Sequence, residues 1–197
     1  LARNEDKLKT ASRELNCRYK VCDVSIWEDV KRAVDEVFNE TGKIDILINN
    51  AGLWIQGPIE DNDPEKIRDV INVNTLGPIF LTKVIVPIMK KQQSGIILNI
   101  NSQAGLCGKA ERAVYHASKW ALTGFAKSML QELQKDNIRV MSIHPAGMKT
   151  KFFEKAGIEK NQENMLDANE VAKTVEFMLS QSESTAFPEV GMLNIKY

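Results

Sequence analysis

The chain has 197 residues, of which 43% are hydrophobic and 26% charged, as in an ordinary soluble globular domain. Its 26 basic residues balance its 26 acidic ones, so the net charge of zero gives no reason to expect a nucleic-acid partner. The longest apolar runs, 44–48 and 79–89, are too short or too interrupted to span a bilayer, and the start of the chain does not resemble a secretory signal. Three cysteines without CxxC spacing fit a reduced protein. We therefore expect a cytoplasmic protein with no membrane partner.

Helical and strand-like patterns alternate along the whole chain. Apolar residues at helical spacing predict the helices, and short apolar runs bounded by turn residues predict the strands. Ser25, followed by Glu28, predicts a capping box at the start of the second helix. The expected elements, in chain order, are a helix over 5–15, a strand over 18–24, a helix from 25 to 41, a strand over 44–48, a long helical stretch over 63–93 with a shift near Gly77-Pro78, a strand over 95–101, a helix over 114–135, a strand over 138–143, short helical pieces within 149–164, a helix over 167–180 and a strand over 190–195.

Strands separated by helices of this length indicate βαβ units with right-handed crossovers. The predicted fold class is therefore α/β, a Rossmann-type doubly wound parallel sheet in three α/β/α layers, forming a single domain over residues 1–197. The 44–48 run is almost entirely apolar, which is typical of a strand covered on both faces. Ligands of such sheets bind beyond the carboxyl ends of the strands. We expect the site just after Val24, Ile48, Asn101 and Ile143.

Tyr115 and Lys119 stand four residues apart at the start of a predicted helix and so share one of its faces. A nearby ammonium group favours the phenolate form, which would make the tyrosine a usable acid or base near neutral pH. Ser102 lies upstream, just past a strand, where its hydroxyl could donate to a developing oxyanion. A Tyr-x-x-x-Lys pair also occurs by chance at the exposed start of ordinary helices, so the pair alone does not identify the chemistry.

Two further segments attract attention. Asn49-Asn50-Ala51-Gly52 follows an apolar strand, where small residues let the backbone approach a ligand, although a simple tight turn has the same composition. Asn74 lies inside a predicted helix, where asparagine is unfavourable. Either a functional role or a kink would account for it.

In this order and at this spacing, the motifs resemble those of the short-chain dehydrogenases/reductases, in the compact single-domain branch that includes carbonyl reductases and 3-oxoacyl-thioester reductases. The resemblance covers essentially the whole chain. The matching segments are Asp23-Val24, similar to the adenine-contacting site, Asn49 to Gly52, similar to the family's Asn-Asn-Ala-Gly motif, Asn74 to Gly77, the strand 95–102 that leads to the catalytic serine, Tyr115 to Lys119, and Pro145 to Thr150, similar to the loop that holds the nicotinamide carboxamide. Pro145-Ala146 departs from the usual Pro-Gly of that loop.

The resemblance implies four catalytic residues. Tyr115 would be the general acid in reduction and the general base in oxidation, and Ser102 would polarise the substrate oxygen. Lys119 would lower the pKa of Tyr115 and contact the nicotinamide ribose, and Asn74 would help hold a proton-relaying water. The cofactor-binding residues that the resemblance implies are Arg3, Asp23, Val24, Asn50, Ala51, Gly52, Tyr115, Lys119, Pro145, Met148 and Thr150.

The start of the chain bears on the cofactor. Residues 1–8 resemble the segment that follows the family's second strand, so a glycine-rich phosphate-binding turn is expected before Leu1, and the fold is expected to be N-terminally incomplete. Arg3 stands where the family reads the adenosine ribose. An arginine there accommodates a 2′-phosphate, which predicts NADP(H) rather than NAD(H), unless Arg3 is a solvated surface residue.

The resulting hypothesis is an NADP(H)-dependent oxidoreductase that interconverts a carbonyl and a secondary alcohol, such as a 3-oxoacyl thioester reductase or a broad carbonyl reductase. The alternatives are a non-enzymatic cofactor-binding or regulatory relative and a nucleotide-sugar epimerase, although the stretch after Ile143 is too short for the epimerase's substrate domain. Segments 53–62, 104–113 and 149–164 should set the substrate without naming it. Two histidines are too few for a metal site, and apolar side chains on helices 79–88 and 121–133 predict a homodimer or homotetramer.

Overall fold

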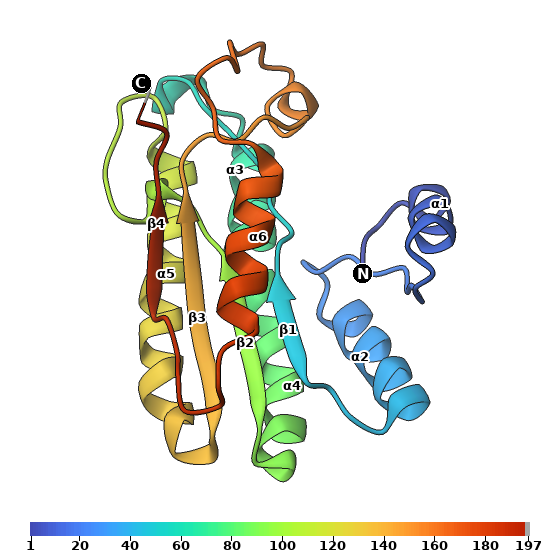
Figure 1. Ribbon diagram of the computed structural model, residues 1–197. Coiled ribbons are helices and arrows are strands. Elements are labelled where there is room, and N and C mark those ends of the chain that lie inside the picture. The colour runs from blue at the N-terminus through green and yellow to red at the C-terminus, as the bar shows by residue number, and fades with distance from the viewer. Residues whose placement is uncertain (196–197) are drawn as a thin grey trace.

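The computed structural model describes residues 1–195 and contains a parallel sheet with α-helices on both faces (Figure 1). The strands run in the order β1-β2-β3-β4, and each pairs with the next in parallel register, as in Ile48 opposite Leu98. Their bounds are β1 Ile46–Asn49, β2 Gly95–Ile100, β3 Ile138–Pro145 and β4 Glu189–Met192. The predicted α/β class, with parallel strands and crossover helices, is confirmed.

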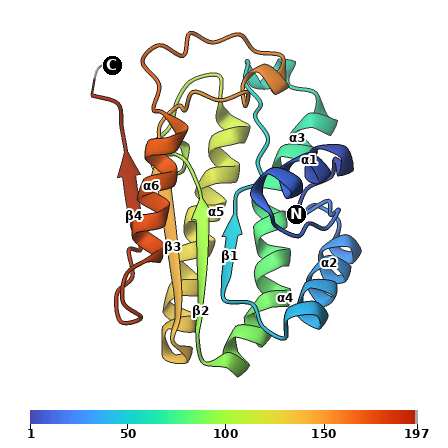
Figure 2. The same ribbon diagram turned by 45° about the vertical axis from the view of Figure 1, so that its right-hand side comes forward.

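In the described part of the chain, six α-helices connect or flank the strands: α1 Glu5–Leu15, α2 Trp27–Thr41, α3 Pro64–Ile71, α4 Gly77–Gln92, α5 Ala113–Leu133 and α6 Ala168–Leu179. Helices α4 and α5 lie on one face of the sheet and α6 lies on the other, which gives the three layers (Figure 2). Helix α2 packs on α4, where the rings of Trp27 and Phe80 meet edge to face at 5.6 Å.

Side chains of successive residues in β2 point to opposite faces of the sheet. Ile97 therefore joins the core beneath α4 and α5, whereas Ile96 and Leu98 join the core beneath α6. In β1 the side chains of Ile46 and Ile48 are 44% and 43% exposed, because the core under α6 draws on β2, β3 and β4. The expectation that this strand is covered on both faces is wrong for the described chain.

Two local predictions near the start are also wrong. Segment 18–24 forms an isolated β-bridge, in which Val21 pairs with Ala2, and not a strand. A strand would need several consecutive residues of a neighbouring segment to pair with, and here only Ala2 pairs. The second helix begins at Trp27 after the uncapped Ile26, because the Ser25 hydroxyl donates to Asp23 at 2.6 Å instead of capping the helix.

The expected shift in the long helical stretch lies over Asn72–Leu76, which form a π-helical turn between α3 and α4. The combined stretch Pro64–Gln92 is long and apolar enough to cross a membrane by length and composition, although the apolar runs had suggested otherwise. Leu81, Ile85 and Met89 bury one side of it in the sheet core, as in the core helix of a globular domain.

Candidate active site

The expected catalytic residues come together at the carboxyl ends of the strands. Ser102 follows β2 and caps a short 3₁₀ turn, where its hydroxyl accepts a hydrogen bond from the Ala104 amide at 3.1 Å. Tyr115 and Lys119 lie in the first two turns of α5. The loops that follow β1 and β3 end beside them, so this edge of the sheet has the position that parallel α/β sheets use for ligands.

Tyr115 and Lys119 are both buried, with exposures of 5% and 4%. The Lys119 Nζ lies 5.9 Å from the centre of the Tyr115 ring and donates a hydrogen bond to the Ile100 carbonyl at 3.3 Å. Burial raises the pKa of Tyr115 to about 12, although its hydrogen bond with Ser102 acts in the opposite direction. Burial also lowers the pKa of Lys119 to about 8. The site therefore holds a neutral phenol beside an ammonium group that gives up its proton readily.

The sequence-based expectation that Lys119 lowers the pKa of Tyr115 is not met by the protein's own groups. Desolvation dominates the pKa of the phenol, and the opposing contribution comes from Ser102. The physical reason is that a low-dielectric site penalises phenolate and ammonium alike. Burial therefore raises the pKa of the phenol and lowers the pKa of the ammonium group, and each shift favours the neutral form.

Asn74 lies in the π-helical turn and is 1% exposed. Its side chain accepts from the Leu53 amide at 2.7 Å and donates to the Leu53 carbonyl at 2.9 Å. It also donates to the Ser118 hydroxyl at 3.0 Å. The side chain thus ties the loop after β1 to the catalytic helix, next to Lys119. The π-helical turn therefore carries the asparagine whose side chain makes these hydrogen bonds.

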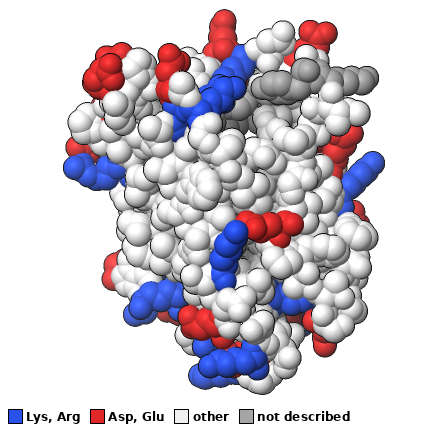
Figure 3. Space-filling model, turned by 90° about the vertical axis from the view of Figure 1, so that its left-hand side faces the viewer, with Lys and Arg blue, Asp and Glu red and all other residues white. Residues whose placement is uncertain are grey.

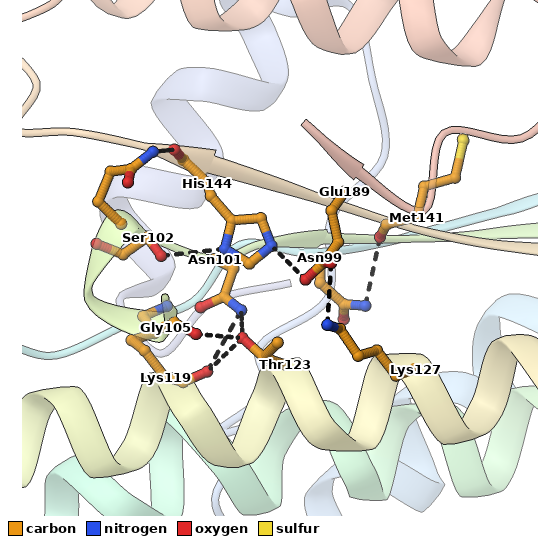
Figure 4. A network of polar contacts seen from close by, with 11 residues as sticks. Asn99, Asn101, Ser102, Gly105, Lys119, Thr123, Lys127, Met141, His144 and Glu189 are labelled. Carbon is orange, nitrogen blue, oxygen red and sulfur yellow. Dashed lines mark hydrogen bonds and ion pairs between the residues drawn. The ribbon is translucent and has the colours of Figure 1, made fainter. Parts of the chain in front are cut away.

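A polar network supports Ser102 and Lys119 from behind (Figure 4). Asn101 donates to the Thr123 hydroxyl at 2.9 Å and to the Lys119 carbonyl at 3.3 Å. His144, which is fully buried, has its Nδ1 3.1 Å from the Ser102 carbonyl and its Nε2 3.6 Å from Glu189. Burial lowers the pKa of His144, against the raising effects of Ser102 and Glu189. A neutral His144 that donates from Nδ1 holds the serine loop to the end of β3.

Aromatic rings cover Tyr115. The indole of Trp54, in the loop after β1, lies 4.3 Å from the Tyr115 ring, centre to centre. Phe152 and Phe153, from the loop after β3, lie 6.3 and 5.0 Å from the same indole. Lys160 lies above this group, with its Nζ 4.5 Å from the Trp54 ring. We call Trp54, Phe152 and Phe153 the aromatic roof.

The residues expected to bind the adenosine part of a cofactor lie beside α2 and α4. The Arg3 guanidinium is 3.6 Å from the Asp23 carboxylate, and the Arg3 side chain is 64% exposed. Burial would raise the pKa of Asp23, but hydrogen bonds from Ser25 and Arg3 outweigh it and the pKa is lowered. Val24 is buried in the core, where a Cβ on Gly77 would come within 2.9 Å of its side chain. That contact explains the glycine at the start of α4.

The remaining expected cofactor residues occupy the loops after β1 and β3. Asn50 and Ala51 are exposed, and Gly52 lies between Asn74 and the Phe152 ring. Pro145 ends β3, and Met148 forms an isolated bridge with Leu166. The Thr150 hydroxyl accepts from the Phe152 amide at 3.3 Å.

These groups fit a nicotinamide nucleotide. Within residues 1–195, the Lys119 ammonium has one hydrogen bond, to Ile100, and so keeps two N–H donors available for ribose hydroxyls. The centre of the Tyr115 ring lies 5.9 Å from the same Nζ, and Ser102 lowers the pKa of that tyrosine. Arg3, one of the residues expected near the adenosine, carries an exposed guanidinium.

Sequence reasoning missed several individual residues. Phe152, Phe153 and Lys160 fell within the expected substrate segment 149–164 but were not singled out, because that segment lacks a repeating pattern. Arg112, 5.4 Å from the Trp54 ring, was missed for the same reason. His144, one of the two histidines, lies in the network behind Ser102.

Comparison with known proteins shows that the chain is similar to dehydrogenases and reductases. The sequence profile described as short chain dehydrogenase matches residues 1–161. Over 128 residues the chain is 40% identical to trans-4-hydroxycyclohexanecarboxylate dehydrogenase of Sinomonas cyclohexanicum, covering 65% of this chain and 49% of that protein. Over 173 residues it is 34% identical to 3-oxoacyl-acyl-carrier-protein reductase FabG of Thermotoga maritima, covering 83% and 70%. The matched part is thus about half the length of the first relative.

Solved structures of dehydrogenases have the same fold as this chain. The closed form of a serine dehydrogenase complexed with NADP+ matches with a TM-score of 0.93 at 25% identity, covering 100% of this chain and 84% of that one. NAD+-bound xylitol dehydrogenase matches with a TM-score of 0.86 at 27% identity, covering 98% and 87%. With the motifs, the parallel sheet and the clustered Ser102, Tyr115 and Lys119, these matches establish that the chain belongs to the short-chain dehydrogenase family of nicotinamide-dependent oxidoreductases.

Proposed function

We propose that the protein interconverts a carbonyl and a secondary alcohol by hydride transfer, using NADP(H). One observation carries this proposal. Ser102, which lowers the pKa of Tyr115, lies with Tyr115 and Lys119 at one edge of the sheet, where the Tyr115 and Lys119 side chains are buried. A positioned proton donor, an oxyanion donor and a cation together are what reduction of a carbonyl needs.

In the reducing direction, the carbonyl carbon gains a hydride, which the nicotinamide supplies when bound. The Ser102 hydroxyl orients the carbonyl oxygen and stabilises the charge that develops on it. The Tyr115 hydroxyl gives its proton to that oxygen, which completes the alcohol. Lys119, with its pKa of about 8, lies close enough to help return a proton to the tyrosine. In oxidation the same transfers run backwards.

The preference for NADP(H) rests on Arg3. Its exposed guanidinium beside Asp23 offers a cation to a 2′-phosphate, whereas Asp23 alone would favour a ribose hydroxyl. The two solved structures described above hold NADP+ and NAD+, respectively, so relatives of this fold use both cofactors. The charge at Arg3 therefore supports the finer assignment.

The proposed substrates are 3-oxoacyl thioesters or a broader set of carbonyl compounds. The relative in Thermotoga maritima is named for the first kind of substrate and the relative in Sinomonas cyclohexanicum for a cyclic hydroxy acid. The aromatic roof over Tyr115 would pack against a flat or apolar carbon skeleton.

A substrate screen tests the proposal. The protein would be mixed with acetoacetyl thioesters, cyclic ketones and secondary alcohols, each with NADP(H) and with NAD(H), while absorbance at the wavelength of the reduced nicotinamide is followed. We expect turnover that is faster with NADP(H). Cofactor binding without turnover of any compound would instead support a non-enzymatic, regulatory relative.

We further propose a cytoplasmic homodimer or homotetramer. The apolar side chains of α4 and α5 that suggested association are largely engaged with their own core, as in Val86 and Leu133. The face beside β4, seen in Figure 3, has many charged side chains toward its edges and one pair of opposite charge near its centre, with uncharged surface around that pair. Light scattering at micromolar concentration would decide the assembly state.

A further inference from the structure

Three cationic side chains gather above the aromatic roof, and the proposed reaction does not use them. The Arg112 guanidinium carbon lies 5.4 Å from the centre of the Trp54 ring, and the Lys160 Nζ lies 4.5 Å from it. Lys160 is also 4.2 Å from the centre of the Phe153 ring. Lys109 lies near enough to repel Lys160. The three come from two different loops, those that follow β2 and β3.

The described residues place no carboxylate in an ion pair with this group. Among residues 1–195, Lys109, Arg112 and Lys160 each lie beyond 4.0 Å from every carboxylate, including the nearby Glu154 and Glu159. Burial, together with the smaller effects of the Arg112 and Lys109 charges, lowers the pKa of Lys160 to about 8. Contact with the Trp54 and Phe153 rings offsets this cost in part, because the face of an aromatic ring attracts a cation. A bound anion would offset the rest.

Trp54 relates this charge to the chemistry. Its indole contacts the Tyr115 ring at 4.3 Å, and the Lys160 ammonium at 4.5 Å from the indole centre. One indole therefore lies between the proposed proton donor and the unpaired cations. A substrate whose carbonyl reaches Tyr115 would have its far end, several bonds away, at Lys160 and Arg112.

We propose, resting on the function proposed above, that Lys160 and Arg112 bind a carboxylate of the substrate. The substrate is then an oxo acid or hydroxy acid whose carboxylate is several bonds from the reacting carbon. In a 2-oxo acid the carboxylate is on the adjacent carbon and would lie against Ser102 and Tyr115, far from the cations. Lys160 is half-buried over apolar rings, which suits the carboxylate of a small ligand better than acidic groups on the surface of a carrier protein.

The test compares 4-oxocyclohexanecarboxylate with its methyl ester, two ketones that differ mainly in charge, and adds pyruvate as a 2-oxo acid. We expect kcat/KM at least about tenfold higher for the acid than for the ester, and poor use of pyruvate. In Lys160→Gln the acid-to-ester ratio should fall about tenfold, and Lys160→Arg should restore it. Lys155→Gln, at an exposed lysine of the same loop, should keep the ratio. An equal ratio in the wild-type protein and Lys160→Gln overturns the inference.

The outcomes separate this inference from the proposed function. Turnover of the ester and the acid at similar rates would leave the oxidoreductase in place and remove the carboxylate site. If neither ketone turned over with either cofactor, binding of trans-4-hydroxycyclohexanecarboxylate would be followed by calorimetry. Binding that Lys160→Gln weakens about tenfold and Lys155→Gln leaves intact would support the carboxylate site while the function fails. Absence of binding would overturn the site as well.

Discussion

The side-chain amide of Asn74 donates a hydrogen bond to the Ser118 hydroxyl at 3.0 Å, and Ser118 immediately precedes Lys119. The same amide group is paired with both backbone groups of Leu53, in the loop that leads to Trp54. One buried side chain thus connects the helix of the proton donor with the loop that covers it.

Asn74→Ala should lower the free energy of unfolding by about 1–3 kcal/mol, because it leaves buried partners on Leu53 and Ser118 unsatisfied. Urea denaturation measures the change. Asn161→Ala, which removes an exposed turn contact to the Glu163 amide, is the matched control and should cost less than about 1 kcal/mol. An equal decrease in the free energy of unfolding in the two variants would show that the hydrogen bonds of Asn74 add no more stability than an exposed turn contact.

Tyr115→Phe should reduce kcat by at least about 100-fold, because it removes the only proton the ring can donate while keeping the ring itself. The contact with Trp54 depends on the ring, so cofactor binding, followed by fluorescence titration, and the thermal midpoint should stay close to those of the wild-type protein. Tyr19→Phe, at a half-buried tyrosine outside the site, should keep full activity. A Tyr115→Phe enzyme that retained more than about a third of kcat would rule out the proposed role.

Gly105→Ala should impair both stability and turnover. A Cβ there would lie 2.7 Å from the Thr123 hydroxyl and 2.9 Å from the Lys119 carbonyl, within the network behind the site. Overpacking of this kind costs about 1–3 kcal/mol. Gly108→Ala, in the same loop, meets nothing within 4 Å and serves as the control. Denaturation and steady-state rates of the two variants should therefore differ, and similar behaviour would refute the packing argument.

Stability should rise with pH where Lys119 titrates. Its pKa is about 8 in the folded protein and 10.5 when exposed, so the unfolded chain binds more protons between these values. The unfolding free energy should therefore increase by up to about 3 kcal/mol as pH rises from about 8 toward 10.5, and the cost of the buried charge is complete below about 8. Above about 10 the raised pKa of Tyr115 acts in the opposite sense, because the folded protein then holds the extra proton.

The measurement compares urea denaturation of the wild-type protein and Lys119→Met at pH of about 7.5 and 9.5. Lys160, whose pKa is also about 8, contributes equally to both proteins and cancels in the difference. The increase attributable to Lys119 should be absent from the variant. Parallel pH profiles would show that Lys119 is not desolvated in the folded state.

Arg3→Asp should shift the cofactor preference toward NAD(H), because a carboxylate repels a 2′-phosphate and accepts from a 2′-hydroxyl. The ratio of kcat/KM for NADP(H) and NAD(H) measures it. Arg18→Asp, at an exposed arginine paired with Glu40, should leave the ratio unchanged. An unchanged ratio in Arg3→Asp would place Arg3 outside the cofactor site.

Local patterns in the sequence were enough to predict the alternating helices and strands, the parallel sheet and the edge at which Ser102, Tyr115 and Lys119 meet. Helical periodicity and apolar runs depend on neighbours along the chain, and the carboxyl ends of parallel strands share one edge whatever their side chains are. The spacing of Tyr115 and Lys119 on one helix likewise needs no tertiary information.

Tertiary packing alone decided the exposure of Ile46 and Ile48, the pairing of Asn74 with Leu53 and Ser118, and the raised pKa of Tyr115. It also brought Trp54, Arg112 and Lys160 together from three loops. Loops lack a repeating pattern, and burial depends on groups distant in sequence, so neither a contact between loops nor the desolvation of a titratable group can be deduced from residue order.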